Sequence, residues 1–224
     1  MMIPYVLFII MICFLFLIIY SFIFTSIYMV IFFKACASIC FVLIAFFSYK
    51  KHPKYSIFFK NIFLGLLFCL LGDVLITMSY IPVFFLSGIT CFFICHLLFI
   101  NGFCRKVPFN HKDILLFFII YIPFILFISF NKSFSFNGYY FFVLIYSMVL
   151  TLMLSKSFSL ITLKKHNKSA IYSMVIGALM FSSSDFMLLF ILFSPYSSSI
   201  LMLLNLFTYY IGQGILALNF NKLY

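Results

Sequence analysis

Residues 57–80 read IFFKNIFLGLLFCLLGDVLITMSY, a long apolar run in which one acidic residue, Asp73, lies far from either end. A helix of this length crosses a hydrocarbon core of roughly 30 Å. A carboxylate in such a helix costs at least roughly 2.5–3.5 kcal/mol on insertion scales, so an intramembrane acid is a functional candidate by default. The stretch therefore predicts both a membrane span and a site within the membrane.

Similar runs repeat along the chain, which is 67% hydrophobic and 8% charged. A soluble core of this length could not hide so much apolar surface. Hydropathy predicts about eight spans. Their expected limits are residues 6–24, 28–49, 57–80, 83–103, 114–130, 139–154, 170–193 and 200–220. The sequence thus predicts an all-α transmembrane bundle, a single integral domain over residues 1–224, in a multi-pass protein of the cell membrane.

The net charge of +11 follows the predicted topology. Basic residues gather in the connections after the second, fourth and sixth spans, whereas the odd-numbered connections hold only Lys132. The clustered residues are Lys50, Lys51, Lys54, Lys60, Arg105, Lys106, Lys112, Lys156, Lys164, Lys165 and Lys168. This alternation predicts that both termini are cytoplasmic, and no nucleic-acid partner is expected. Asp113 falls in a basic connection, where we expect it to be solvated.

A second membrane acid, Asp185, lies in the seventh predicted span. The third and seventh spans both run outward, which places Asp73 and Asp185 roughly 10 Å below the outer boundary at 1.5 Å per residue. Lys34 and Asn205 have matching depths on the second and eighth spans. A polar cavity in the outer half of the bundle would keep all four groups away from lipid.

Further polar side chains extend this predicted cavity. Tyr209 and Gln213 follow Asn205 at four-residue spacing on one face of a helix, and His96 lies nearer the depth of Gln213. Small residues on the third and seventh spans predict close helix packing. They are Gly65, Cys69 and Gly72 on the third span and Gly177, Ala178, Ser182, Ser183 and Ser184 on the seventh. Two structural alternatives stay open. The aspartates could form a clamp that only stabilises the fold, and His96 could be an ordinary interior histidine.

The seven cysteines lie in or at the ends of apolar runs. An odd number inside a bilayer is not a disulfide framework. Cys91, Cys95 and His96 have a spacing that suits a shared helical face, but no second Cys or His cluster accompanies them, so neither a metal nor another cofactor is expected.

Short motifs resemble, in order and in spacing, those of the YhhN-like lysoplasmalogenase family, whose members have eight spans. The motifs are LLGDVL (70–75), FFLSG (84–88), CHLLF (95–99), GALMF (177–181) with Ser184-Asp185, and YYIGQ (209–213). The resemblance covers most of the chain after the first span. Two positions depart from the family pattern: Ala35 stands where proline usually follows the lysine, and Phe99 stands where tyrosine is common.

The resemblance implies hydrolysis of the vinyl ether bond of lysoplasmalogens to a fatty aldehyde and glycerophosphoethanolamine or glycerophosphocholine. Such a bond hydrolyses by protonation of its β-carbon, and water captures the resulting oxocarbenium ion. We expect Asp73 and Asp185 to divide the acid and base roles, as paired carboxyl groups do in glycosidases, although the sequence does not assign them. The residues expected to bind or support the substrate are Lys34, His96, Ser184, Asn205, Tyr209, Tyr210 and Gln213, with Gly72 as the motif glycine.

Lysophospholipids and membrane lipids are the expected partners. Four alternatives remain at this point: a hydrolase of other lysolipids, a proton-coupled transporter with broken helices, a receptor that uses the acids as a clamp, and a membrane zinc hydrolase.

Overall fold

The computed structural model describes residues 2–24, 27–49, 56–163, 167–219 and 222. Within these ranges the chain forms eight α-helices and one short 3-10 helix. The α-helices are α1 (Met2–Phe24), α2 (Ile27–Tyr49), α3 (Ile57–Thr77), α4 (Pro82–Lys106), α5 (His111–Phe130), α6 (Tyr140–Phe158), α7 (Lys168–Phe193) and α8 (Ser199–Asn219), and the 3-10 helix η1 (Ser159–Thr162) follows α6. All eight α-helices are long and apolar enough to span a membrane, which confirms the predicted fold class. Several residues used in the topology prediction lie outside the described residues, namely Lys50, Lys51, Lys54, Lys164, Lys165 and Phe220.

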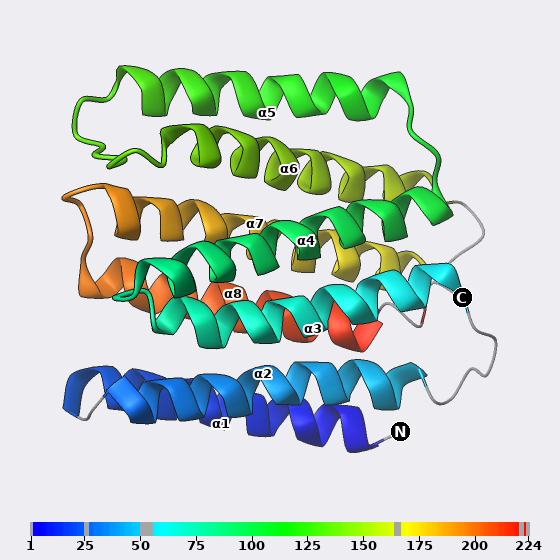
Figure 1. Cartoon of the computed structure of the whole chain (residues 1–224). Helices are drawn as coiled ribbons and strands as arrows, with labels where there is room; N and C mark the ends of the chain where they lie inside the picture. The colour runs from blue at the N-terminus through cyan, green and yellow to red at the C-terminus, as the bar shows by residue number, and fades with distance from the viewer. Residues whose placement is uncertain (1, 25–26, 50–55, 164–166, 220–221, 223–224) are drawn as a thin grey trace.

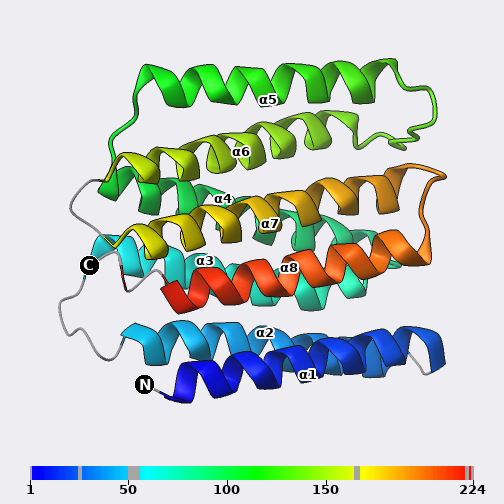
Figure 2. The ribbon, with the colours of Figure 1, turned by 180° about the vertical axis from the view of Figure 1, so that it is seen from behind.

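The helices form a bundle in which α3, α4, α7 and α8 lie between the pair α1 and α2 and the pair α5 and α6 (Figures 1 and 2). There α3 packs on α4 and α7 packs on α8, while α2 contacts both α3 and α8. On one side α1 packs on α2 and α8, and on the opposite side α5 packs on α6, which in turn contacts α4 and α7. α1 begins and α8 ends at the same end of the bundle (Figure 1). That arrangement is what an even number of spans produces, and the predicted cytoplasmic location of this end stays a prediction.

Glycines allow the central helices to approach closely. A Cβ atom placed on Gly177 of α7 would lie 3.1 Å from the carbonyl oxygen of Gly212 on α8, and one placed on Gly212 would lie 3.0 Å from the carbonyl oxygen of Gly177. On α3, a Cβ atom on Gly65 would lie 2.4 Å from the ring of Phe99 on α4. These contacts have the small-residue packing typical of membrane helices.

The predicted solvation of Asp113 is wrong. Its side chain belongs to the first turn of α5 and the residue is only 3% exposed. Asp113 Oδ2 lies 2.7 Å from the Nζ atom of Lys156, itself fully buried, and also accepts a hydrogen bond from the backbone N–H of Asn110. Lys156 Nζ donates a second hydrogen bond, 2.9 Å long, to the carbonyl oxygen of Pro108. The predicted sixth span ended too early at residue 154, because partners inside the bundle satisfy the polar residues that follow it and α6 continues past Lys156.

We expect Lys156→Met to destabilise the protein by about 3–5 kcal/mol, because it leaves the Asp113 carboxylate buried without its counter-charge. Thermal unfolding in detergent measures the effect. Lys112→Met is the matched control, since Lys112 is exposed one residue before Asp113, and its effect should stay within about 0.5 kcal/mol. Equal losses in the two variants would contradict a stabilising ion pair.

Candidate active site

A polar cavity lies between α2, α3, α7 and α8, with Phe92 of α4 also in its lining, in the half of the bundle that contains the α3–α4 turn. Its volume is about 30 Å³, and because a water molecule needs about 10–15 Å³ of cavity space, one or two waters fit. The polar residues that line it are Lys34, Asp73, Ser184, Asp185, Asn205, Tyr209 and Tyr210. The structure therefore brings both membrane aspartates, which are distant in sequence, to one cavity.

Asp73 is buried and held through one carboxylate oxygen. Its Oδ2 atom accepts a 2.5 Å hydrogen bond from Ser38 Oγ of α2 and a 2.8 Å hydrogen bond from Tyr209 Oη of α8. Tyr210 Oη lies 3.5 Å from Ser38 Oγ and donates a 3.4 Å hydrogen bond to the carbonyl oxygen of Lys34. Asp73 Oδ1 makes no hydrogen bond with any residue that the structure describes. One oxygen is thus fixed by two helices and the other stays available.

Asp185 is held in the same manner by α4 and α6. Its Oδ2 atom accepts a 2.5 Å hydrogen bond from Tyr146 Oη and lies 2.7 Å from His96 Nε2. The His96 ring is fully buried and stacks on Phe181 of α7 at 4.7 Å between ring centroids. Within the described part of the chain, Asp185 Oδ1 has no hydrogen-bond partner. Each of the two aspartates therefore keeps one carboxylate oxygen free of protein hydrogen bonds.

Two of the other predicted site residues organise the backbone next to Asp185. Asn205 Nδ2 of α8 donates a 2.6 Å hydrogen bond to the carbonyl oxygen of Ser184. The Ser184 hydroxyl donates to the carbonyl oxygen of Phe181 one turn earlier in its own helix, at 2.7 Å. Ser184 thus adjoins the cavity while its hydroxyl is already used, and Asn205 ties α8 to α7.

Gln213 lies outside the cavity lining. Its Nε2 atom is 3.4 Å from the sulfur of Cys69, which in turn is 3.0 Å from the sulfur of Cys95. Cys95 therefore faces α3 while the adjacent His96 faces Asp185. Among the described residues there is no group of three or more His, Cys, Asp or Glu side chains that could hold a metal ion.

The motif glycine, Gly72, makes room for an aromatic ring of α4. A Cβ atom at this position would lie 2.9 Å from the ring of Phe92. Phe92 lines the polar cavity, so a larger residue at position 72 would displace a ring of the cavity wall.

Two partners of the aspartates, Ser38 and Tyr146, were not predicted from the sequence. Ser38 follows Lys34 by four residues and so shares its helical face, a signal that could have identified it. Tyr146 has no comparable signal, because many aromatic residues surround it in the sequence of α6.

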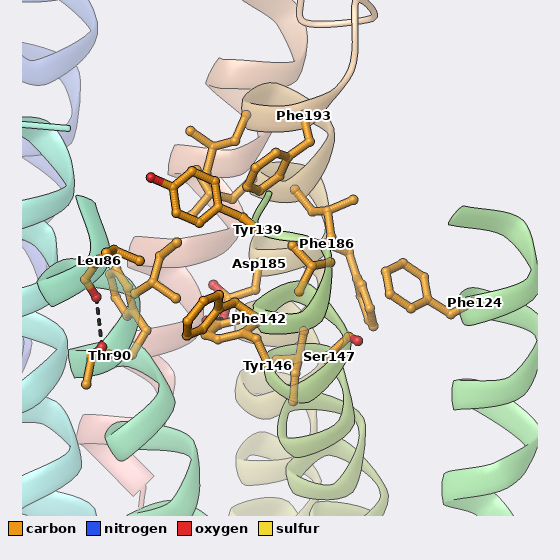
Figure 3. Close-up of a pocket in the computed structure, with 17 residues that line it drawn as sticks. Leu86, Thr90, Phe124, Tyr139, Phe142, Tyr146, Ser147, Asp185, Phe186 and Phe193 are labelled. Carbon is orange, nitrogen blue, oxygen red and sulfur yellow. Dashed lines mark hydrogen bonds between the residues drawn. The ribbon is translucent and has the colours of Figure 1, made fainter. Parts of the chain in front are cut away.

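A second cavity, of about 90 Å³, lies between α4, α6 and α7, and Phe124 of α5 also lines it (Figure 3). Its lining is almost entirely apolar, with Phe142, Phe186 and Phe193 among the aromatic residues labelled in Figure 3. Asp185 and Tyr146 lie at its inner wall, and the other polar residues of the lining are Thr90, Tyr139 and Ser147. Asp185, together with Phe92 and Leu188, borders both cavities, so this aspartate stands where a polar and an apolar space meet.

Residues 29–220 match the YhhN family. The chain belongs to this family. The match confirms the resemblance seen in the motifs, and it extends from α2 to the end of α8, so that every residue lining either cavity lies within it. The YhhN family is associated with lysoplasmalogenase activity. No curated protein and no solved structure matches this YhhN chain.

With a lysoplasmalogen, the substrate associated with the YhhN family, as the test substrate, we expect Tyr146→Phe to lower turnover by about ten- to a hundredfold. The substitution removes a hydrogen bond that stabilises the charged form of the Asp185 carboxyl group, and such bonds contribute about 1.5–3 kcal/mol. Tyr140→Phe is the control, since the Tyr140 hydroxyl bonds to Ser129 of α5 and lies outside both cavities. Turnover by Tyr146→Phe within twofold of that by Tyr140→Phe would show that this hydroxyl does not position Asp185.

Proposed function

We propose that this protein is an intramembrane hydrolase that cleaves the vinyl ether bond of lysoplasmalogens to a fatty aldehyde and a glycerophosphoethanolamine or glycerophosphocholine. The observation that carries the proposal is that Asp73 and Asp185 border one cavity, each with an oxygen free of protein hydrogen bonds. Membership of the YhhN family supports the substrate class. A single-chain amphiphile is also a suitable substrate for a site buried among membrane helices.

The chemistry needs an acid, a base and negative charge. An acid adds a proton to the β-carbon of the vinyl ether, which leaves an oxocarbenium ion at the carbon that carries the ether oxygen. A base removes a proton from water as the water oxygen bonds to that carbon, forming a hemiacetal. The hemiacetal then breaks its bond to the glycerol oxygen, which takes a proton, while the aldehyde carbonyl forms. Two carboxyl groups can supply both roles, and a carboxylate stabilises the cation between them.

Lys34 adds a positive charge to the cavity. It lines the same space as Asp73, whose carboxylate attracts it, and among the described residues its ammonium group makes no hydrogen bond and no ion pair within 4.0 Å. An ammonium group of this kind suits the phosphate of a lysophospholipid head group. Asn205, Tyr209 and Tyr210 complete the polar wall on which the glycerol would lie.

A proton-coupled transporter is the principal alternative from another class. Carriers typically bind their substrates at broken helices near the membrane midplane. Here α3 continues through Asp73 and α7 continues through Asp185 without a break. The unbroken helices favour the hydrolase.

Purified protein in detergent should release aldehyde from 1-alkenyl lysophosphoethanolamine and none from its saturated 1-alkyl counterpart. In deuterium oxide, aldehyde that is reduced as it forms should carry one deuterium on carbon 2, because the acid adds a solvent-derived proton there. Mass spectrometry measures both results. Release of fatty acid from the 1-acyl counterpart without aldehyde from the alkenyl lipid would instead indicate a hydrolase of other lysolipids, and no release from any lipid would reject the enzyme.

Asp73→Asn and Asp185→Asn should each lower aldehyde release by about 10²- to 10⁴-fold, the usual contribution of a general acid or base. The change keeps the size of the side chain, so folded protein should still be recovered. Asp113→Asn is the matched control: it alters the one remaining acid, which borders neither cavity, and turnover per folded molecule should persist. If the Asp73→Asn and Asp185→Asn variants both fail to fold, these two aspartates form a structural clamp.

A further inference from the structure

The apolar cavity between α4, α6 and α7 has a closed inner wall and an open rim. Val143, Ser147 and Leu150 of α6 are buried and form part of the inner wall. Leu86 of α4 and Phe142 of α6 are 36% and 57% exposed and also line the cavity. Thr90, labelled beside Leu86 in Figure 3, is exposed as well.

Because these helices are membrane spans by length and composition, the rim between α4 and α6 faces the hydrocarbon of the bilayer. The cavity therefore runs from the acyl-chain region of the membrane to the Asp185 carboxyl group. An unbranched hydrocarbon chain is the occupant that such a lining suits, since an apolar space open to lipid offers a polar ligand no compensation for lost hydration.

We propose that this cavity holds the hydrocarbon chain of the substrate, so that Asp185 is the acid that protonates the vinyl ether and Asp73 is the base that activates water. The inference rests on the proposed hydrolase activity and extends it to the orientation of the substrate.

The assignment follows from the polarity of the vinyl ether itself. Its β-carbon, which receives the proton, is the carbon attached to the hydrocarbon chain. The neighbouring carbon, which water attacks, carries the ether oxygen and leads to the glycerol and phosphate. In this orientation the hydrocarbon chain lies in the apolar cavity and the head group lies near Lys34. The β-carbon is then close to Asp185, which borders both cavities. The attacked carbon lies toward Asp73, which borders only the polar cavity.

The cycle balances with these two carboxyl groups and one water. Asp185 gives its proton to the β-carbon and becomes ionised, while Asp73 takes a proton from the attacking water and becomes neutral. As the hemiacetal breaks down, its hydroxyl proton returns to Asp185 and the glycerol oxygen takes the proton from Asp73. Both groups return to their starting states after one aldehyde and one alcohol are released.

His96 and Tyr146 are positioning residues in this scheme. Both bond to Asp185 Oδ2, which leaves Oδ1 to reach the substrate. Ser38 and Tyr209 hold Asp73 Oδ2 in the same way, which leaves its other oxygen for water.

The chain site can be tested without catalysis because the protein contains no Trp. Phe142→Trp places one fluorophore in the cavity lining, and Phe141→Trp places one at the neighbouring position of α6, which is 67% exposed and lies outside the lining. The probe is a saturated-ether lysophosphocholine with a dibrominated chain, added in small amounts to detergent micelles. The tryptophan fluorescence of Phe142→Trp should be quenched with saturation at a low mole fraction of probe in the micelle. The tryptophan fluorescence of Phe141→Trp should instead fall gradually as the mole fraction of probe in the micelle rises. Gradual quenching in both variants would overturn the chain site.

The roles of the two acids can be separated with sodium azide, a nucleophile that captures a cation without a base. In Asp73→Ala, azide should accelerate consumption of the vinyl ether at least tenfold and yield the azide adduct, because Asp185 still forms the cation. In Asp185→Ala, azide should have no effect, since it replaces no proton donor. Rescue of Asp185→Ala instead, of both variants or of neither would overturn the assignment.

Failure of the proposed function is distinguishable from failure of this inference. A wild-type protein that releases no aldehyde while the Phe142→Trp variant shows saturable quenching would reject the hydrolase and keep the chain site. An active wild-type protein without saturable quenching, or with the reversed azide result, would keep the hydrolase and reject the orientation.

Discussion

The cost of placing a carboxyl group among membrane helices is the constraint on which this structure depends. The chain has three acidic residues, and each meets partners from at least one other helix. Asp73 of α3 bonds to side chains of α2 and α8, Asp185 of α7 to side chains of α4 and α6, and Asp113 of α5 to Lys156 of α6. Burial of the acids therefore links most of the bundle through polar contacts between helices.

The three acids divide into one clamp and two candidate catalytic groups. Asp113 pairs with a fully buried lysine, caps the first turn of α5 and borders neither cavity. Asp73 and Asp185 instead border a polar cavity that has room for water, and each has an oxygen without a protein partner. Asp113 also bonds through Oδ2 alone, but its carboxylate meets a lysine counter-charge and borders no cavity. This contrast is the physical basis of the proposed activity.

The two cavities share one wall, which Asp185 and Leu188 of α7 supply together with Phe92 of α4. On one side of it α2, α3 and α8 contribute the ammonium, hydroxyl and amide groups of the polar cavity, and on the other side α4 and α6 contribute the apolar lining. A lysophospholipid has the same division between a phosphate head group and a single chain. The bond that joins its two parts would lie beside Asp185, at the junction.

The sequence by itself determined the class of protein, the number of spans, the family motifs and the common depth of the two acids, because length, hydropathy and a rise of 1.5 Å per residue are local properties. It also identified the polar residues that line the polar cavity, namely Lys34, Asp73, Ser184, Asp185, Asn205, Tyr209 and Tyr210.

Only the tertiary structure decided that Ser38 and Tyr146 hold the aspartates, that Lys156 neutralises Asp113, that Gln213 contacts Cys69, and that an apolar cavity reaches Asp185. Polar residues mark one face of α8, at Asn205, Tyr209 and Gln213, but apolar side chains cover nearly every face of most other helices, so no amphipathic stripe indicates which of their faces turns inward. The rotation of each helix about its axis is set by contacts between helices distant in sequence, which the local pattern does not encode.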